Sequence, residues 1–130
     1  MTKKRLPDAE FAIMDFIWDR EPPVTTTMVH TEFGDKKGWK LQTIVSYFGR
    51  LVERGFLRAE NSGGKSRNFY PLISKEEYLE METQNFMRQY NFKSPASLIS
   101  TLSYGKNLSE EDLDELEQLI RETRKRNGRR

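Results

Sequence analysis

The chain has 130 residues, a formal net charge of +2, a single histidine and no cysteine. The lack of cysteine excludes disulfides, thiol nucleophiles and thiolate metal sites, and one histidine provides no pair of imidazole ligands, so we expect no metal and no cofactor. No apolar run approaches the roughly 20 residues that a membrane span needs, and no apolar segment follows the basic N-terminal residues, so we expect a cytoplasmic protein.

The N-terminal third of the chain predicts two helices. Apolar residues at helical spacing predict the first helix over 8–19, with Asp8 as its N-cap and two prolines after its end. The second helix is predicted over about 26–33. Gly34 ends it, and residues 35–38 have the composition of a turn.

A third helix, over 41–54, precedes a predicted β-hairpin. Gly55 suits a left-handed position after the helix end, and two short β-prone segments, 56–60 and 68–72, enclose a Gly-Gly turn. Three helices followed by a hairpin is the element order of a winged helix-turn-helix domain. The apolar residues that share one face of the third helix are Leu41, Ile44, Phe48 and Leu51.

Three more helices are predicted in the C-terminal half. Ser74 and Glu77 match a capping box for the first of them, which we expect to reach Tyr90. The second begins at Ser94-Pro95. Ser109 caps the last helix, whose first turn is acidic and whose end is expected to fray after residue 126. The predicted fold class is therefore mainly α with a small β-hairpin.

The C-terminal half is too small to be stable by itself. Three helices with narrow apolar stripes bury little surface, so we expect two copies to pair through them. The alternative is that they pack on the winged domain of the same chain. The predicted domains are a winged-helix DNA-binding domain at 1–73 and a helical dimerisation domain at 74–130. The residues expected in the dimer interface are Tyr78, Phe86, Tyr90, Leu98, Leu102, Leu113, Leu116 and Ile120.

Positive charge is concentrated on the third helix and the hairpin. Residues 36–67 carry eight basic and two acidic side chains, which marks a candidate anion-binding surface. A DNA-reading helix presents polar groups to base edges and cations to phosphates. An ordinary amphipathic helix beside a basic, soluble hairpin is the alternative. We assign Gln42, Thr43 and Ser46 to base edges, Val45 to a thymine methyl group, and Lys40 and Arg50 to the phosphate backbone. Lys65 and Arg67 of the hairpin are expected either to hold phosphate or to reach the minor groove.

Two functions are compatible with these patterns. The first is a homodimeric repressor of a palindromic DNA operator, because two copies would present two recognition helices about one helical turn, or a multiple of it, apart. The second is a winged-helix module that binds protein, since a fold alone does not fix a function. We expect no enzyme, because His30 belongs to no catalytic arrangement and the acidic runs lie at helix starts, where they favour the helix dipole.

Several short motifs, in this order and spacing, resemble the penicillinase repressor family of the BlaI/MecI type. Residues 6–11 read Leu-Pro-Asp-Ala-Glu-Phe and are followed by Ile17-Trp18. The family has a similar Asp-Ala-Glu-Trp start and aliphatic-Trp pair, so Phe11 replaces a tryptophan. The resemblance covers nearly the whole chain. Its later motifs are Thr43-Ile44, Arg50-Leu51, Gly55-Phe56-Leu57, Phe69-Tyr70-Pro71-Leu72 and residues 108–116.

This resemblance implies a dimeric repressor that binds a dyad operator, typically one controlling a β-lactam resistance gene and the operon of its sensor. It also implies that Thr43 and Ser46 face bases and that Arg50 holds phosphate. Gln42 and Val45 stand where the family often has Lys and Arg, so we expect a different operator sequence.

The resemblance also bears on induction. In the best-known members, repression ends when an Asn-Phe bond in the dimerisation helices is cleaved. The bond at that place here is Thr101-Leu102, so the usual site is not kept. An inducing protease or membrane sensor pathway acting at this bond is the corresponding expectation. The cysteine cluster of related copper-responsive repressors is absent from this chain.

Overall fold

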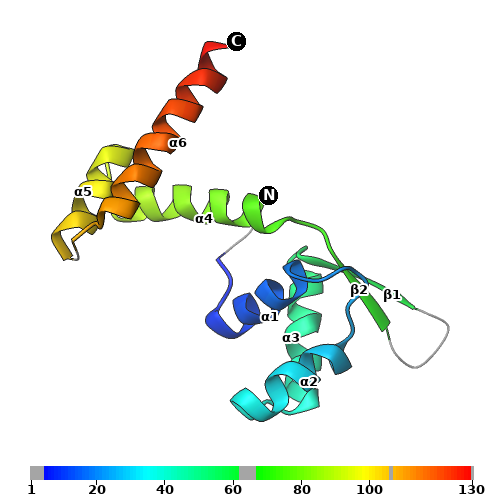
Figure 1. Ribbon diagram of the computed structural model, residues 1–130. Coiled ribbons are helices and arrows are strands. Elements are labelled where there is room, and N and C mark those ends of the chain that lie inside the picture. Colours follow the sequence, from blue (N-terminus) through cyan, green and yellow to red (C-terminus); the bar gives the residue numbers. More distant parts are fainter. Residues whose placement is uncertain (1–4, 62–66, 106, 130) are drawn as a thin grey trace. The chain divides into compact units, whose positions relative to one another are not determined.

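The computed structural model describes residues 5–61, 67–105 and 107–129, which form six helices and one two-stranded antiparallel sheet (Figure 1). The mainly α fold with a small hairpin is thus confirmed. The chain divides into two compact units, Met1–Thr83 and Gln84–Arg130, and each is described by itself. The elements are α1 (Asp8–Trp18), α2 (Thr26–Lys37), α3 (Leu41–Glu53), β1 (Leu57–Asn61), β2 (Arg67–Pro71), α4 (Lys75–Gln89), α5 (Pro95–Gly105) and α6 (Glu110–Gly128).

The hydrophobic core of the N-terminal unit joins α1, α2, α3 and the hairpin. The three helices lie together beside the two strands (Figure 1), and buried residues from all of these elements form one cluster. Full burial of one large apolar side chain contributes about 1.5–3 kcal/mol, so this shared core is the main force that orients α3. Its buried residues are Leu6, Ile13, Met14, Ile17, Val24, Val29, Ile44, Phe48, Leu51, Phe56, Leu57, Phe69 and Tyr78.

The hairpin is fastened to the helices at Phe69. Strands β1 and β2 pair in antiparallel register from Leu57 opposite Pro71 to Asn61 opposite Arg67, one residue away from the predicted ends. Both backbone hydrogen bonds of Phe69 go to Val24, at 2.9 and 3.0 Å. Its ring packs edge-on against Phe48 of α3, with 4.6 Å between centroids. The wing and the third helix therefore share one anchor.

The ends of α1 and α2 differ from the prediction. Asp8 is the first residue of α1 rather than its cap, and Pro7 occupies the cap position without a side-chain hydrogen bond. Helix α2 continues past Gly34 to Lys37, so most of the expected turn at 35–38 is helical. The left-handed residue that ends α2 is Gly38, with φ 67°, and the lysines before it suit the negative end of the helix dipole.

Helix α3 begins at the predicted residue and ends at Glu53, one residue before the predicted end. Ile44, Phe48 and Leu51 are fully buried, but Leu41 is 43% exposed, so its assignment to the buried stripe is wrong. Leu41 is the first residue of the helix, where no preceding turn lies beside it on the core side. Gly55 has φ 83°, which confirms the predicted left-handed position after the helix.

Local capping predictions hold in the C-terminal half. Ser74 and Glu77 form the reciprocal capping box, with both hydrogen bonds at 3.0 Å. Ser109 and Asp112 form a second one. Helix α6 continues to Gly128, beyond the expected fraying point. Helix α4 ends at Gln89, one residue before the predicted end.

The N-terminal unit extends beyond the expected boundary after residue 73, because Tyr78 belongs to its core. Tyr78 is 3% exposed, and its hydroxyl accepts a 2.8 Å hydrogen bond from the backbone N–H of Leu6. The ring packs against Phe11, Trp18 and Phe56. A side chain buried in this way is not available to a second copy, so the assignment of Tyr78 to the dimer interface is wrong.

Candidate nucleic-acid interface

An aromatic cluster fixes the turn between α2 and α3. Phe33 of α2, Trp39 of the turn and Tyr47 of α3 pack in series, with ring centroids 5.2 and 5.6 Å apart. Aromatic pairs in such geometries add about 0.5–1.5 kcal/mol beyond the area they bury. Trp39 is therefore a packing residue, and the cluster holds the N-terminal end of α3 against α2.

The exposed face of α3 carries the residues that the sequence assigned to DNA. Lys40 lies at the N-cap position, and the side chains of Gln42, Thr43 and Ser46 are exposed on the helix surface. Val45 is 51% exposed. The buried side of the helix consists of Ile44, Phe48 and Leu51. The opposite side is polar and exposed to solvent. A helix of this kind presents hydrogen-bonding groups at the width of a major groove.

Arg50 is not a free cation, which the sequence did not reveal. Its Nε lies 3.7 Å from Glu10 Oε2, and its guanidinium carbon lies 5.1 Å from the ring centroid of Tyr47. The same Glu10 carboxylate accepts a 2.9 Å hydrogen bond from Arg54. The Arg50 side chain is half-exposed, so it is held in place and still reaches the surface. Glu10 and Arg54 are thus site residues that sequence reasoning missed.

The wing supplies one described cation to this surface. Arg67, at the start of β2, is exposed and lies near the ring of Phe69, 5.9 Å from its centroid. The companion assignment, Lys65, lies outside the described residues. A groove of about 580 Å³ runs between α3 and β2. Its lining includes Leu41, Val45 and Arg67, so the structure brings the helix and wing residues to one concave surface.

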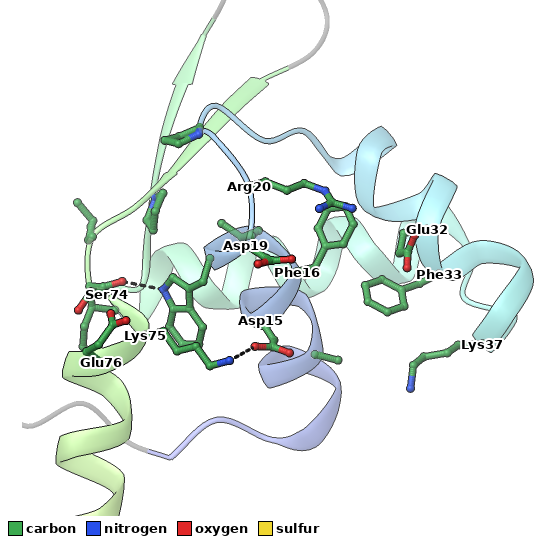
Figure 2. Close-up of a pocket in the computed structure, with 17 residues that line it drawn as sticks. Asp15, Phe16, Asp19, Arg20, Glu32, Phe33, Lys37, Ser74, Lys75 and Glu76 are labelled. Carbon is green, nitrogen blue, oxygen red and sulfur yellow. Dashed lines mark hydrogen bonds and ion pairs between the residues drawn. The ribbon is translucent and has the colours of Figure 1, made fainter. Parts of the chain in front are cut away.

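A second groove, of about 1110 Å³, lies between α1, α2 and the segment that follows β2 (Figure 2). Lys75 donates a 2.7 Å hydrogen bond to Asp15, and the indole of Trp18 donates one of 2.8 Å to the Ile73 carbonyl. The Asp15 carboxylate raises the pKa of Lys75 above its ordinary value, chiefly through this hydrogen bond. Both acidic and basic side chains line this groove, so it lacks the one-sided charge of a phosphate-binding surface.

The C-terminal unit has a large uncovered apolar surface. No described residue of 84–130 is buried, although aromatic contacts link Phe86 to Tyr90 and Phe92 at 5.0 and 5.7 Å. Leu98 and Leu116 are half-buried. Tyr104 and Leu119, which were not among the residues expected in the dimer interface, are exposed in the same way. The exposed large apolar residues of this unit are Phe86, Tyr90, Leu102, Tyr104, Leu113, Leu119 and Ile120.

The bond between Thr101 and Leu102 lies inside α5. Both residues are exposed, and the Thr101 hydroxyl donates a 2.9 Å hydrogen bond to the Ser97 carbonyl one turn earlier. A protease binds its substrate as an extended strand. Cleavage at this bond therefore requires α5 to unwind locally.

The fold and the exposed face of α3 define a winged helix-turn-helix protein. A family model described as Penicillinase repressor matches residues 6–122, and the chain therefore belongs to the penicillinase repressor family. This family is one of transcriptional repressors and not of enzymes, and both the family and the fold support a DNA-binding repressor. None of the helices in the described residues is long and apolar enough to cross a membrane.

Two relatives and one solved structure illustrate the match. The chain is 26% identical over 126 residues to a penicillinase repressor of Bacillus licheniformis, covering 95% of this chain and 97% of the relative. It is 25% identical over 112 residues to an uncharacterised 16.5 kDa protein of Latilactobacillus sakei, covering 86% and 75%. The solution structure of the DNA-binding domain of the repressor BlaI superposes with a TM-score of 0.51 at 26% identity, covering 58% of this chain and 90% of that domain.

Proposed function

We propose that this protein is a homodimeric transcriptional repressor that places α3 in the major groove of a palindromic DNA operator. The exposed face of α3 carries the proposal. Gln42, Thr43 and Ser46 offer hydrogen bonds to base edges, and Arg50 and Arg67 flank them as cations for phosphates. Membership of the penicillinase repressor family and the likeness to the BlaI DNA-binding domain support the same function.

The dimer is supported by the uncovered surface of the C-terminal unit. A helical unit with no buried residue in its described part gains little stability from its own packing. Pairing two copies about a two-fold axis covers the same apolar side chains on both partners. It also brings two winged domains to one DNA duplex, and this is why the operator is expected to be palindromic.

Membership of the family supports a proposal for the regulated genes. The relative in Bacillus licheniformis is named a penicillinase repressor, so the proposed targets are a β-lactam resistance gene and the operon of its sensor. A protease or membrane sensor pathway that ends repression belongs to the same proposal, with α5 as the segment on which it acts.

Fluorescence anisotropy on labelled duplexes tests the DNA-binding step. One duplex comes from the region upstream of the protein's own reading frame, and its matched control has the same base composition in shuffled order. Each is titrated at about 50 and 200 mM salt, a range over which phosphate contacts weaken strongly. We expect a preference of about 10³-fold or more for the upstream duplex, and a steep loss of affinity at the higher salt.

Two results would count against the proposal. Equal affinity for both duplexes would show non-specific attraction to DNA and contradict an operator in that region. No binding to either duplex would contradict DNA binding itself, and the winged helix would then be a module that binds protein. The oligomeric state is tested separately by sedimentation equilibrium of the full chain.

A further inference from the structure

Gly49 lies inside α3 with no reason in the fold for being glycine. Apart from proline, glycine is the residue least favoured inside a helix. A Cβ built on Gly49 would meet nothing within 4 Å outside its own stretch of helix. The protein itself therefore has room for a side chain at this position, and a glycine here weakens the helix without a packing benefit.

Other described glycines have explanations that Gly49 lacks. Gly38 and Gly55 have positive φ, which other residues rarely adopt. A Cβ on Gly34 would lie 3.1 Å from the His30 ring. Gly105 and Gly128 are the last residues of their helices, where glycine is common. Among these glycines, Gly49 alone lies inside a helix and has neither a positive φ nor a close neighbour. Its one distinctive feature is the empty space beside it on an exposed helix face.

The space above Gly49 continues into the groove between α3 and the wing. Gly49, Val45 and Leu41 are spaced four residues apart, so they form one row along the helix. All three line the groove of about 580 Å³, together with Arg67 of β2. Val45 and Leu41 are 51% and 43% exposed. The row is therefore an apolar strip with a notch at its C-terminal end.

The charge of this groove indicates the kind of ligand that binds beside Gly49. Its lining contains the cation Arg67 and no carboxylate. A mostly apolar groove whose one charged lining residue is a cation fits a nucleic-acid strand, whose phosphates are anionic and whose sugars and thymine methyl groups are apolar. An acidic peptide would also satisfy the charge, and the experiment below separates the two.

We propose that Gly49 is the point at which operator DNA approaches α3 most closely, and that Val45 and Leu41, about one and two turns earlier in the same row, contact thymine methyl groups. This inference rests on the proposed DNA-binding function and deepens it. Glycine is used elsewhere where a ligand must approach the backbone. The operator is accordingly predicted to carry thymine at the base pairs that face the N-terminal half of α3.

The decisive variant is Gly49→Ala, which adds one methyl group at the notch. The duplex is one that the wild-type protein selects from a random-sequence library. We expect the variant to melt at an equal or higher temperature by circular dichroism, because alanine favours the helix, and to bind the selected duplex at least tenfold more weakly. Gly128→Ala adds the same methyl at another exposed glycine and is expected to leave the affinity unchanged.

A second measurement tests the thymine contacts. Replacing single thymines in the selected duplex by deoxyuridine removes only the C5-methyl group. We expect one or two such replacements to weaken wild-type binding several-fold. The replacement at the thymine that faces Val45 should have little further effect on the affinity of Val45→Ala.

Each outcome has one meaning. Wild-type affinity in Gly49→Ala, or indifference of the wild type to every deoxyuridine, would overturn this inference while leaving the repressor function intact. If the wild type selects no duplex at all, the proposed function itself fails. If Gly49→Ala melts below the wild type, the premise that the fold has room at this position is wrong.

Discussion

The carboxylate of Glu10, on α1, accepts a 2.9 Å hydrogen bond from Arg54 at the end of α3. Glu10 is only 3% exposed, whereas the Arg54 side chain is 38% exposed. The second carboxylate oxygen lies 3.7 Å from Arg50. One buried anion on the first helix thus holds two cations, one on α3 and one at its C-terminal end, and it couples the stability of the domain to the position of Arg50.

The two partners of this ion pair should respond unequally to mutation. In Arg54→Met, the Glu10 carboxylate stays buried with only the more distant Arg50 near it, and we expect a loss of about 3 kcal/mol in the free energy of unfolding. In Glu10→Gln, both arginines can turn to water, and we expect a loss of about 1–2 kcal/mol. Urea denaturation at pH 7 measures both values. A larger loss in Glu10→Gln than in Arg54→Met would contradict this reading of the pair.

Arg50→Ala should weaken binding to all duplexes by a similar factor, because a phosphate contact carries no sequence information. The slope of log affinity against log salt should fall by about one. The matched variant is Gln42→Ala, which should instead relax the preference for the operator, at about 1–3 kcal/mol for a good base contact. An unchanged salt slope in Arg50→Ala would show that Glu10 keeps this side chain away from the DNA.

Tyr78→Phe should destabilise the N-terminal unit. The variant leaves the N–H of Leu6 without its acceptor, and a buried donor without a partner costs about 1–3 kcal/mol. The matched variant is Tyr104→Phe, at an exposed tyrosine, which should change the free energy of unfolding little. Thermal melts of the two variants, compared with wild type at neutral pH, decide the point. Equal melting temperatures for all three proteins would mean that the hydrogen bond contributes nothing measurable.

The same tyrosine should make the domain sensitive to alkali. Burial raises the pKa of Tyr78 above its ordinary value, so the folded chain holds this proton more tightly than the unfolded chain. Ionisation then favours unfolding, and stability should fall as the pH rises above about 10. Tyr78→Phe should show a shallower alkaline loss than the wild type in urea titrations at increasing pH. An identical alkaline slope in both proteins would contradict this assignment.

Leu119→Glu should shift the protein from dimer to monomer, because it places a charge on the exposed apolar surface of the C-terminal unit. The matched variant is Leu72→Glu, at a similarly exposed leucine of the N-terminal unit, which should leave association unchanged. Sedimentation equilibrium over a range of concentrations measures both. If Leu119→Glu dimerises as the wild type does, the interface lies elsewhere in the chain.

Local signals in the sequence were sufficient for much of the fold. The capping boxes of Ser74 and Ser109, the left-handed Gly55 and the buried stripe of α3 each depend on residues within about one or two turns. Their outcomes follow from propensity and hydrogen bonding between neighbours. The exposed polar face of α3 is predictable for the same reason, because it consists of the residues that lie opposite the buried stripe on the helix.

Contacts between distant residues were not predictable in this way. Leu6 and Tyr78 are separated by 72 positions, and Glu10 and Arg54 by 44. No periodicity in a single sequence links such pairs. Tyr78 was therefore assigned to the dimer interface instead of the core, and Glu10 was not recognised as the partner of two arginines. The end of α2 was misjudged because Gly34 and Gly38 are both acceptable helix ends, and only Gly38 adopts the left-handed conformation.

Both tryptophans of the chain, Trp18 and Trp39, lie in the N-terminal unit. Trp18 is held by its indole hydrogen bond and Trp39 by the aromatic cluster in front of α3. Intrinsic tryptophan emission therefore observes only the winged unit, whereas far-ultraviolet circular dichroism is dominated by helices of both units. Following one thermal melt by both signals would separate the unfolding of the two units without any label.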